Sequence, residues 1–379
     1  MSRHPIVRCC RRHPASPAAQ VPLQVADLRR FCRQVYEALG VPQADAALAA
    51  DVLVAADLRG IPSHGVARLW RYVNGIRCGL MVPNAAMDIV RETPVSLVVD
   101  AHGGMGAPVS VRTMQRVIRK ARVRGAAFAA VRDSNHFGIA GYYAMLALRH
   151  NMLGIAMTNT AALAVPTFGR RPMIGTNPLA FAAPAGRERA FVLDMSTTVV
   201  TRGKLEVYAR AGRKLPRGWA VDAAGRPATD ARRVLRALGR LSGGGLLPLG
   251  GAGEEFGGHK GYGLAVLVDI LCGLLSGGPC GPDVRDTATS SARVGHFFAA
   301  IRVDLFRDPR EFRRDMDRML ARLRRCPPAA GADRVYFAGQ KELAHESQYV
   351  REGVPMPPSV FESLCDLGRE LAIRPPRTA

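Results

Sequence analysis

The chain reads AAFAAV over residues 126–131, GIAM over 154–157, LAFAA over 179–183 and FVLDM over 191–195. Each run is short and apolar and is followed by polar residues or by Gly or Pro, which is typical of buried strands. Only one long helix is expected among them, near residues 140–150. Strands that follow one another with few helical crossovers pair in a mixed or antiparallel way, so the pattern predicts a mixed sheet rather than a parallel βαβ sheet.

Outside this region the pattern becomes helical on both sides. Further strands are expected at SLVVD (96–100) and HFFAAIRVDLF (296–306), with a helix over 108–124 between them. Apolar residues at three-to-four spacing predict helices over 24–57 and 309–325, and a last helix begins near Pro357 with Ser359 as its N-cap. The predicted divisions are an N-terminal helical segment (21–95), a mixed-sheet domain (96–306) and C-terminal helices (307–379).

Residues 1–20 differ from the rest of the chain. They contain four arginines, three prolines and no acidic residue, without the apolar core of a secretory signal. We expect a disordered basic extension or a start codon assigned too early; an Arg-rich transit peptide is the alternative.

The composition is that of an ordinary globular protein. Of 379 residues, 48% are apolar and 22% charged, which excludes disordered, collagen-like and small disulfide-stapled chains. The net charge of +22 comes almost entirely from arginine, because only five of the 53 basic residues are lysines. Such a bias along the whole chain favours solvated surface arginines, and no zinc-finger spacing accompanies it. The sequence therefore disfavours a nucleic-acid partner.

Cysteine spacing and hydropathy predict a cytoplasmic protein without a membrane-spanning segment. The eight cysteines form no C-x-x-C pair, which predicts reduced thiols and a cytoplasmic protein. The most apolar helix is expected over 263–275. Its length of about 13 residues, interrupted by Asp269, is too short to cross a bilayer, so no membrane association is expected.

The common nucleotide-binding motifs are absent. No G-x-G-x-x-G follows a strand, and no G-x-x-x-x-G-K-[ST] occurs. A Rossmann or P-loop enzyme is therefore disfavoured, and the candidates for chemistry are polar clusters at the ends of apolar runs.

The first cluster is SHGVAR at residues 63–68. His64 lies in a predicted turn and Arg68 follows one helical turn later. An arginine binds a carboxylate through two hydrogen bonds, and a histidine exchanges a proton with a nearby oxygen. The alternative is a loop histidine that caps the next helix.

Other clusters follow the predicted strands. They are DSNHFG (133–138), MTNT (157–160), GTNP (175–178) and DMSTT (194–198), for which ordinary turn and capping chemistry is the alternative. GGHKGYG (257–263) opens the apolar helix with glycines and Lys260, an arrangement that suits a pyrophosphate. Its alternative is a flexible connector.

Taken together and in order, the motifs SHGVAR, DSNHFGIAGYYA, TNT, GTNPLAFAAP, DMSTT, GGHKGYGLA and GVPMPPSV resemble the type 2 malate/L-lactate dehydrogenase family over residues 22–373. That family also contains sulfolactate, ureidoglycolate and diketogulonate dehydrogenases and reductases of cyclic imino acids. The resemblance implies a non-Rossmann α/β fold with a mixed sheet that binds NAD or NADP, helical N- and C-terminal segments packed together, and a homodimer.

The resemblance also implies roles for individual residues. His64 and His136 match the active-site histidines, Ser63 and Arg68 match positions on the substrate side, and Thr160 matches a substrate contact. The implied cofactor contacts are Asp194, Met195, Ser196, His259, Lys260, Gly261 and Gly339. One departure concerns the cofactor: where the family has Pro-Gly-Glu, this chain has Ala338-Gly339-Gln340, and Gln340 supplies no carboxylate.

The expected function is hydride transfer between NAD(P) and a small 2-hydroxy acid or its 2-oxo acid, with Arg68 on the carboxylate. His64 is favoured as the proton carrier because it accompanies Arg68, although His136 is the alternative. A reductase of cyclic 2-imino acids is the second interpretation. Outside the enzyme class, the alternatives are a catalytically inactive homologue, which would be expected to have lost His64, His136 or Lys260, and a basic nucleic-acid-associated protein, which the salt dependence of non-specific DNA binding would test.

Overall fold

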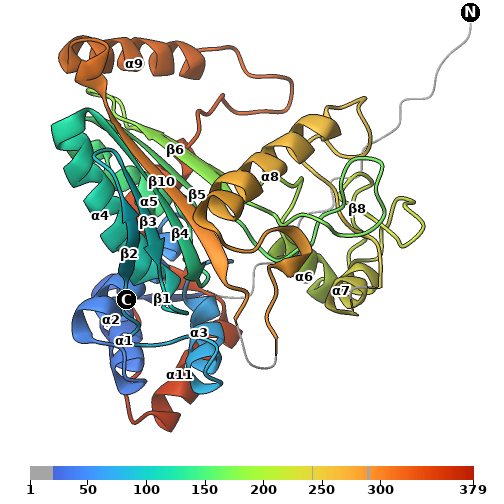
Figure 1. Ribbon diagram of the computed structural model, residues 1–379. Helices are drawn as coiled ribbons and strands as arrows, with labels where there is room; N and C mark the ends of the chain where they lie inside the picture. The colour runs from blue at the N-terminus through green and yellow to red at the C-terminus, as the bar shows by residue number, and fades with distance from the viewer. Residues whose placement is uncertain (1–19, 241, 288–290) are drawn as a thin grey trace, which may run out of the picture.

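A mixed seven-stranded sheet forms the centre of the protein, in the order β2-β3-β4-β10-β5-β6-β7 (Figure 1). The computed structural model describes residues 20–240, 242–287 and 291–379, so the predicted extension over 1–20 lies outside the described residues except for Gln20. Only β3 and β4 run parallel, and every other neighbouring pair is antiparallel. The prediction of a mixed, non-Rossmann sheet is confirmed. The strands are β2 (Asp88–Glu92), β3 (Ser96–Asp100), β4 (Ala126–Ser134), β5 (Met152–Thr158), β6 (Leu179–Ala183), β7 (Phe191–Met195) and β10 (Val294–Arg302).

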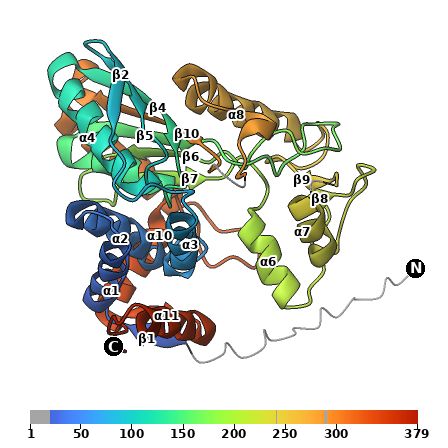
Figure 2. The same cartoon turned by 60° about the horizontal axis from the view of Figure 1, so that its bottom comes forward.

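Helices cover both faces of this sheet (Figures 1 and 2). The parallel pair β3–β4 needs a crossover, and α4 (Gly106–Arg124) provides it. Alternate residues of β10 point to opposite faces: Phe298 packs in the same cluster as α4 and α5 (Ala140–Leu146), whereas Phe297 packs on α8 (Gly258–Cys272). Buried strands with apolar residues on both faces explain why the sequence shows continuous apolar runs.

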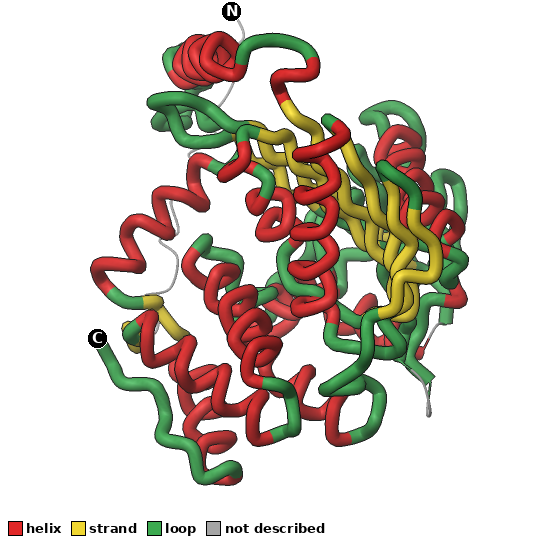
Figure 3. The backbone as a smooth tube through the Cα atoms, turned by 60° about the vertical axis from the view of Figure 1, so that its left-hand side comes forward, coloured by secondary structure: helices red, strands yellow, loops and turns green. Residues whose placement is uncertain are grey.

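The first and last described segments of the chain, from residue 21 and up to residue 379, pack together beside the sheet (Figure 3). Strand β1 (Val21–Leu23) pairs antiparallel with β11 (Val354–Met356). Trp70 Nε1 donates to the Ser363 carbonyl at 3.4 Å. The predicted packing of the terminal segments is therefore confirmed. The helices of this block are α1 (Val25–Ala38), α2 (Gln43–Leu58), α3 (Leu69–Arg77), α10 (Gln340–Glu352) and α11 (Pro358–Glu370).

The start of α11 differs from the prediction. The helix begins at Pro358, its N-cap is Pro357, and Ser359 already lies inside the helix. A proline at the first helical position has no N–H to satisfy, so this start needs no side-chain cap. A side-chain cap occurs instead at α9 (Pro309–Arg324), where Asp308 accepts from the backbone N–H groups of Arg310 and Glu311.

A smaller lobe between β7 and β10 has its own apolar core, which includes Leu205, Leu215, Leu238 and Leu246. It contains α6 (Arg202–Arg210), β8 (Ala220–Val221), α7 (Ala231–Arg240) and β9 (Gly245–Leu246). Helix α6 of this lobe lies opposite α3 of the terminal helices (Figure 2).

Helix α8 is longer than the sequence predicted. Together with the 3₁₀ turn that follows it, Gly258–Ser276 has 19 residues and a mean hydropathy of 1.3, which by length and composition alone is enough to cross a membrane. In the described fold, Val268 and Cys272 of this helix are buried against β10. The other face of the helix is exposed at Leu267 and Ile270, so α8 is only partly buried in the described fold.

Candidate active site

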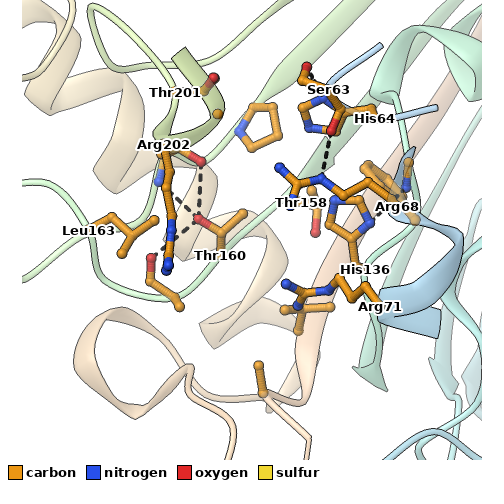
Figure 4. Close-up of a pocket in the computed structure, with 18 of the residues that line it drawn as sticks. Ser63, His64, Arg68, Arg71, His136, Thr158, Thr160, Leu163, Thr201 and Arg202 are labelled. Atoms are coloured by element: carbon orange, nitrogen blue, oxygen red, sulfur yellow. Dashed lines mark hydrogen bonds between the residues drawn. The ribbon is translucent and has the colours of Figure 1, made fainter. Parts of the chain in front are cut away.

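A cavity of about 390 Å³ lies between the terminal helices, the ends of β4 and β5, and the start of α6. Five residues predicted from the sequence line it: Ser63, His64, Arg68, His136 and Thr160. In Figure 4 the side chains of His64, Arg68 and His136 gather on one side, and Thr160 and Arg202 lie on the other. Segments from four parts of the chain thus meet at one site.

The loop that carries His64 is held by a buried carboxylate. Asp57, at the end of α2, accepts a hydrogen bond from the Val66 backbone N–H at 2.7 Å. A Cβ on Gly65 would lie 2.0 Å from Asp57 Oδ1, so this turn requires glycine. Burial raises the pKa of Asp57 to about 7. Sequence reasoning missed Asp57, which is one of three aspartates in α2 and is not distinguished from the other two by the sequence.

His64 is half-buried, and one of its ring nitrogens faces a hydroxyl. Its Nδ1 lies 3.0 Å from Ser63 Oγ, a hydroxyl that can donate or accept. Burial, together with the positive charge of Arg68, lowers the pKa of His64 to about 4. His64 is therefore neutral at pH 7 and has the capacity to take up a proton.

His136 lies against His64 and contacts α3. The two imidazole rings stack with centroids 5.6 Å apart and planes inclined by 18°. His136 Nδ1 lies 2.6 Å from Tyr72 Oη and accepts from the Gly138 backbone N–H at 3.3 Å. Burial, followed by the positive potential of His64 and Arg71, keeps the pKa of His136 well below its usual value. Tyr72 was not predicted from the sequence.

Three arginines line the same cavity. Arg68 donates through Nε to the Ser63 carbonyl at 2.7 Å, which ties its guanidinium to the His64 loop. Arg71 lies one turn further along α3, and Arg202 enters from the first residue of α6. Arg202 Nε pairs with Glu206 at 3.2 Å. The sequence singled out only Arg68, because its many arginines make the others indistinguishable before folding.

The wall opposite the histidines joins two of the predicted polar clusters. Thr160 donates its backbone N–H to Asn177 Oδ1 at 3.0 Å, and its Oγ1 accepts from the Thr176 N–H at 2.9 Å. Ser196 Oγ donates to the Thr176 carbonyl at 3.2 Å, so the DMSTT segment supports the same wall. Asn177 has a positive φ of 34° and is fully buried, consistent with a residue held by its hydrogen bonds.

A second cavity, of about 230 Å³, contains Asp194 and Gly339. Asp194 Oδ2 accepts from the Gly141 N–H at 2.7 Å. Gly339 has a φ of +90°, and a Cβ there would lie 2.9 Å from the Val192 side chain. A turn from the C-terminal segment can therefore approach β7 closely only with glycine at this position.

Two stretches of chain run from one cavity to the other. Arg59 and Ile61 line the second cavity while Ser63 and His64 line the first. In the same way, Gly138 lines the first cavity and Gly141 the second. A Cβ on Gly141 would lie 2.9 Å from Asp194 Oδ2. These shared walls fit one elongated ligand that occupies both cavities.

Comparison with known proteins identifies the family. The model of the malate/L-lactate dehydrogenase family matches residues 23–365. This chain belongs to the malate/L-lactate dehydrogenase family. It is 41% identical to malate dehydrogenase from Pyrococcus abyssi over 92% of this chain and 94% of the relative. It is 36% identical to L-sulfolactate dehydrogenase from Methanocaldococcus jannaschii over 91% and 96%.

Solved structures give the same result. The crystal structure of malate dehydrogenase from Entamoeba histolytica superposes with a TM-score of 0.91 at 32% identity and covers 94% of this chain and 99% of that one. The malate/L-lactate dehydrogenase family is diverse in name, since a ureidoglycolate dehydrogenase (NAD(+)) from Escherichia coli O157:H7 is 31% identical over 86% of this chain. The family and fold predicted from the motifs are confirmed.

The other cofactor contacts that the family resemblance implied do not line either cavity. His259, Lys260 and Gly261 form the first turn of α8, where His259 and Lys260 are exposed, and line neither cavity. Gly261 has a packing role, because a Cβ there would lie 2.2 Å from the Leu249 carbonyl oxygen. Met195 ends β7 and also lines neither cavity.

This chain departs from the family pattern at residue 340, where glutamine replaces glutamate, and the structure shows what the glutamine does. Gln340 Oε1 accepts from the Phe337 backbone N–H at 3.3 Å, so the amide closes its own turn. Glu342, two residues later, does line the second cavity. A carboxylate is therefore present in this cavity, although not at the position that the family pattern predicts.

Proposed function

We propose that this dehydrogenase catalyses reversible hydride transfer at C2 of a small 2-hydroxy acid that carries a second acidic group, with NAD or NADP as its cofactor. The observation that carries the proposal is the stacked His64–His136 pair beside Arg68 in one cavity. The two cavities with shared walls support binding of a dinucleotide. The relatives named as malate and sulfolactate dehydrogenases support the substrate class.

The residues of the first cavity divide the work of positioning and proton transfer. Arg68 binds the C1 carboxylate through its guanidinium, whose Nε is already fixed to the loop. Arg71 and Arg202 provide positive charge for the second acidic group. Thr160 lies on the opposite wall and orients the substrate.

The nicotinamide, when bound, supplies or accepts the hydride at C2. In the reducing direction the oxo oxygen gains negative charge as C2 becomes tetrahedral, and His64, after taking a proton from solvent, delivers that proton to the oxygen and returns to its neutral form. In the oxidising direction neutral His64 takes the hydroxyl proton. The depressed pKa of His64 favours its neutral form, which is the base that oxidation needs.

The cofactor-binding assignments are part of the proposal. Asp194 and Gly339 border the second cavity and would hold the nucleotide portion, with Ser196 supporting the wall between the cavities. His259, Lys260 and Gly261 stay a prediction from family resemblance. The choice between NAD and NADP, a homodimer and a cytoplasmic location stay predictions as well. Unpaired thiols at the described cysteines support a reducing compartment.

A substrate panel followed by the absorbance of the reduced nicotinamide tests the proposal. The panel contains malate, sulfolactate, lactate, ureidoglycolate and a cyclic imino acid, each with both cofactors. We expect the highest kcat/KM for malate or sulfolactate. Turnover of the cyclic imino acid without turnover of any 2-hydroxy acid would make the protein an imine reductase and overturn the proposal.

A further inference from the structure

Tyr72 and Gly138 both contact the same nitrogen of His136. Tyr72 Oη lies 2.6 Å from Nδ1, and the Gly138 backbone N–H points to it at 3.3 Å. Tyr72 is 4% exposed and lies on α3, whereas Gly138 follows β4, so two separate elements converge on one atom. Tyr72 lies outside the sequence motifs, and Gly138 is the last residue of the DSNHFG motif.

The donor count at this nitrogen determines its protonation. A backbone N–H can only donate, so Nδ1 must present its lone pair to Gly138. The Tyr72 hydroxyl is then required to donate to the same atom. A neutral imidazole carries one proton, and with Nδ1 unprotonated that proton belongs to Nε2.

The surroundings of His136 also oppose a second proton. Among the described residues, the groups whose charge or hydrogen bonding acts on this ring are imidazoles, guanidinium groups and a hydroxyl, whereas the carboxylates of Glu206 and Asp286 line other parts of the same cavity. The groups that act on the ring are His64 on the loop, Arg68 and Arg71 before and on α3, Tyr72 on α3, and His296 on β10. His296 is fully buried between Thr158 Oγ1 and Ser134 Oγ, at 2.8 and 2.9 Å, and is itself neutral because burial lowers its pKa to about 3.

We propose that Tyr72 is a positioning residue that, together with the Gly138 N–H, locks His136 as a neutral imidazole with its proton on Nε2. This inference rests on the proposed function for its catalytic consequence. His136 then acts as a permanent hydrogen-bond donor to the reacting C2 oxygen and does not exchange a proton with it. Such a preorganised donor stabilises the negative charge that develops on that oxygen.

The contrast with His64 assigns the two histidines different roles. His64 Nδ1 faces Ser63 Oγ, which can either donate or accept, so His64 can gain and lose a proton with a partner in every state. His136 lacks this freedom, because a proton on Nδ1 would face the Gly138 backbone N–H, which can only donate. The proton carrier is therefore His64, and His136 polarises the oxo group.

The tautomer is tested without substrate by the ¹⁵N shifts of the histidine rings. In ¹⁵N-histidine-labelled protein we expect one ring whose ¹⁵N shifts show an unprotonated Nδ1 and a protonated Nε2. These shifts should stay constant between pH 6 and 9, and the signals should be absent in His136→Gln. In Tyr72→Phe this signal should move toward the average of the two tautomers. Tyr36→Phe is the matched control, because Tyr36 packs edge-on against Tyr72 at 6.2 Å and does not line the cavity.

Kinetics of the same variants test the catalytic consequence. We expect Tyr72→Phe to lower kcat about 10-fold, because the His136 Nε2–H would no longer be held in place as a hydrogen-bond donor. The substrate KM should change less than about 3-fold. Tyr36→Phe should keep both parameters. A His136 ring protonated at Nδ1 in the unsubstituted protein, or a Tyr72→Phe variant with normal kcat and unchanged shifts, would overturn the inference. Absence of turnover with all 2-hydroxy acids would instead overturn the proposed function, because the ring shifts need no substrate.

Discussion

The imidazole rings of His64 and His136 stack almost parallel, with centroids 5.6 Å apart. Two positive rings at this distance would repel each other in a buried site, so at most one of them is protonated at a time. The pair therefore functions with one proton carrier and one neutral donor. Their different partners, Ser63 Oγ for His64 and Tyr72 Oη for His136, decide which is which.

Substitution of each histidine by asparagine should separate these roles. His64→Asn keeps polarity but cannot transfer a proton, so kcat should fall by at least about 100-fold with the cofactor KM nearly unchanged. His136→Asn retains an amide donor and should lose less. The measurement is kcat against pH for both variants. Near-normal kcat in His64→Asn together with a collapse in His136→Asn would reverse the assignment.

Arg68→Lys should affect binding more than turnover. Lysine keeps the charge but loses the planar fork that binds a carboxylate through two hydrogen bonds, and it also loses the contact to the Ser63 carbonyl. Steady-state kinetics should show substrate KM rising more than kcat falls. A variant that binds substrate normally but turns over slowly would place Arg68 in the chemical step instead.

Arg71→Gln and Arg202→Gln test the recognition of a second acidic group. Each removes a positive charge from the cavity wall, so kcat/KM for malate should fall about 10-fold or more while that for lactate changes little. Arg116→Gln is the control, because Arg116 is exposed on α4 and lines neither cavity. Equal losses on malate and lactate would show that these arginines do not select the substrate.

Asp57→Asn should change how stability depends on pH. The pKa of Asp57 is about 7 in the folded protein, above its ordinary value of 3.8, because burial disfavours the carboxylate. The folded state thus holds a proton that the unfolded state releases, and this group's contribution to the free energy of unfolding falls as pH rises from about 4 to 7.

The measurement compares Tm of Asp57→Asn with that of the parent protein at several pH values. The variant has no such titration, so its Tm relative to the parent should increase from pH 4 to pH 7. A constant Tm difference across this range would mean that Asp57 keeps an ordinary pKa in the folded protein.

Lys260→Ala tests the cofactor role predicted from the glycine-rich segment. If Lys260 contacts the pyrophosphate, the cofactor KM should rise about 10- to 150-fold, which corresponds to roughly 1.5–3 kcal/mol for a charge-assisted contact. Lys214→Ala is a matched control at another exposed lysine of the smaller lobe. An unchanged cofactor KM would remove Lys260 from the site and leave Gly261 with a packing role alone.

The elements and the main motifs of this protein were readable from its sequence. Strands such as residues 126–131 can be recognised in the sequence, because a strand that is buried on both faces of a sheet needs consecutive apolar residues. SHGVAR and the NHFG segment place His64, Arg68 and His136 at the ends of elements, where polar side chains meet a cavity. These are local properties, and each depends on fewer than about 20 neighbouring residues.

Only the tertiary structure decided which of these residues meet. Strand β10 is inserted between β4 and β5, which are neighbours in the chain, so the sheet order is not the chain order. Tyr72 and His136 are 64 residues apart, and Asp57 reaches Val66 only because a buried turn folds back on α2. The protonation of His136 depends on donors from two elements. Because local spacing carries no information on such long-range contacts, the roles of the two histidines follow from the fold and not from the motif.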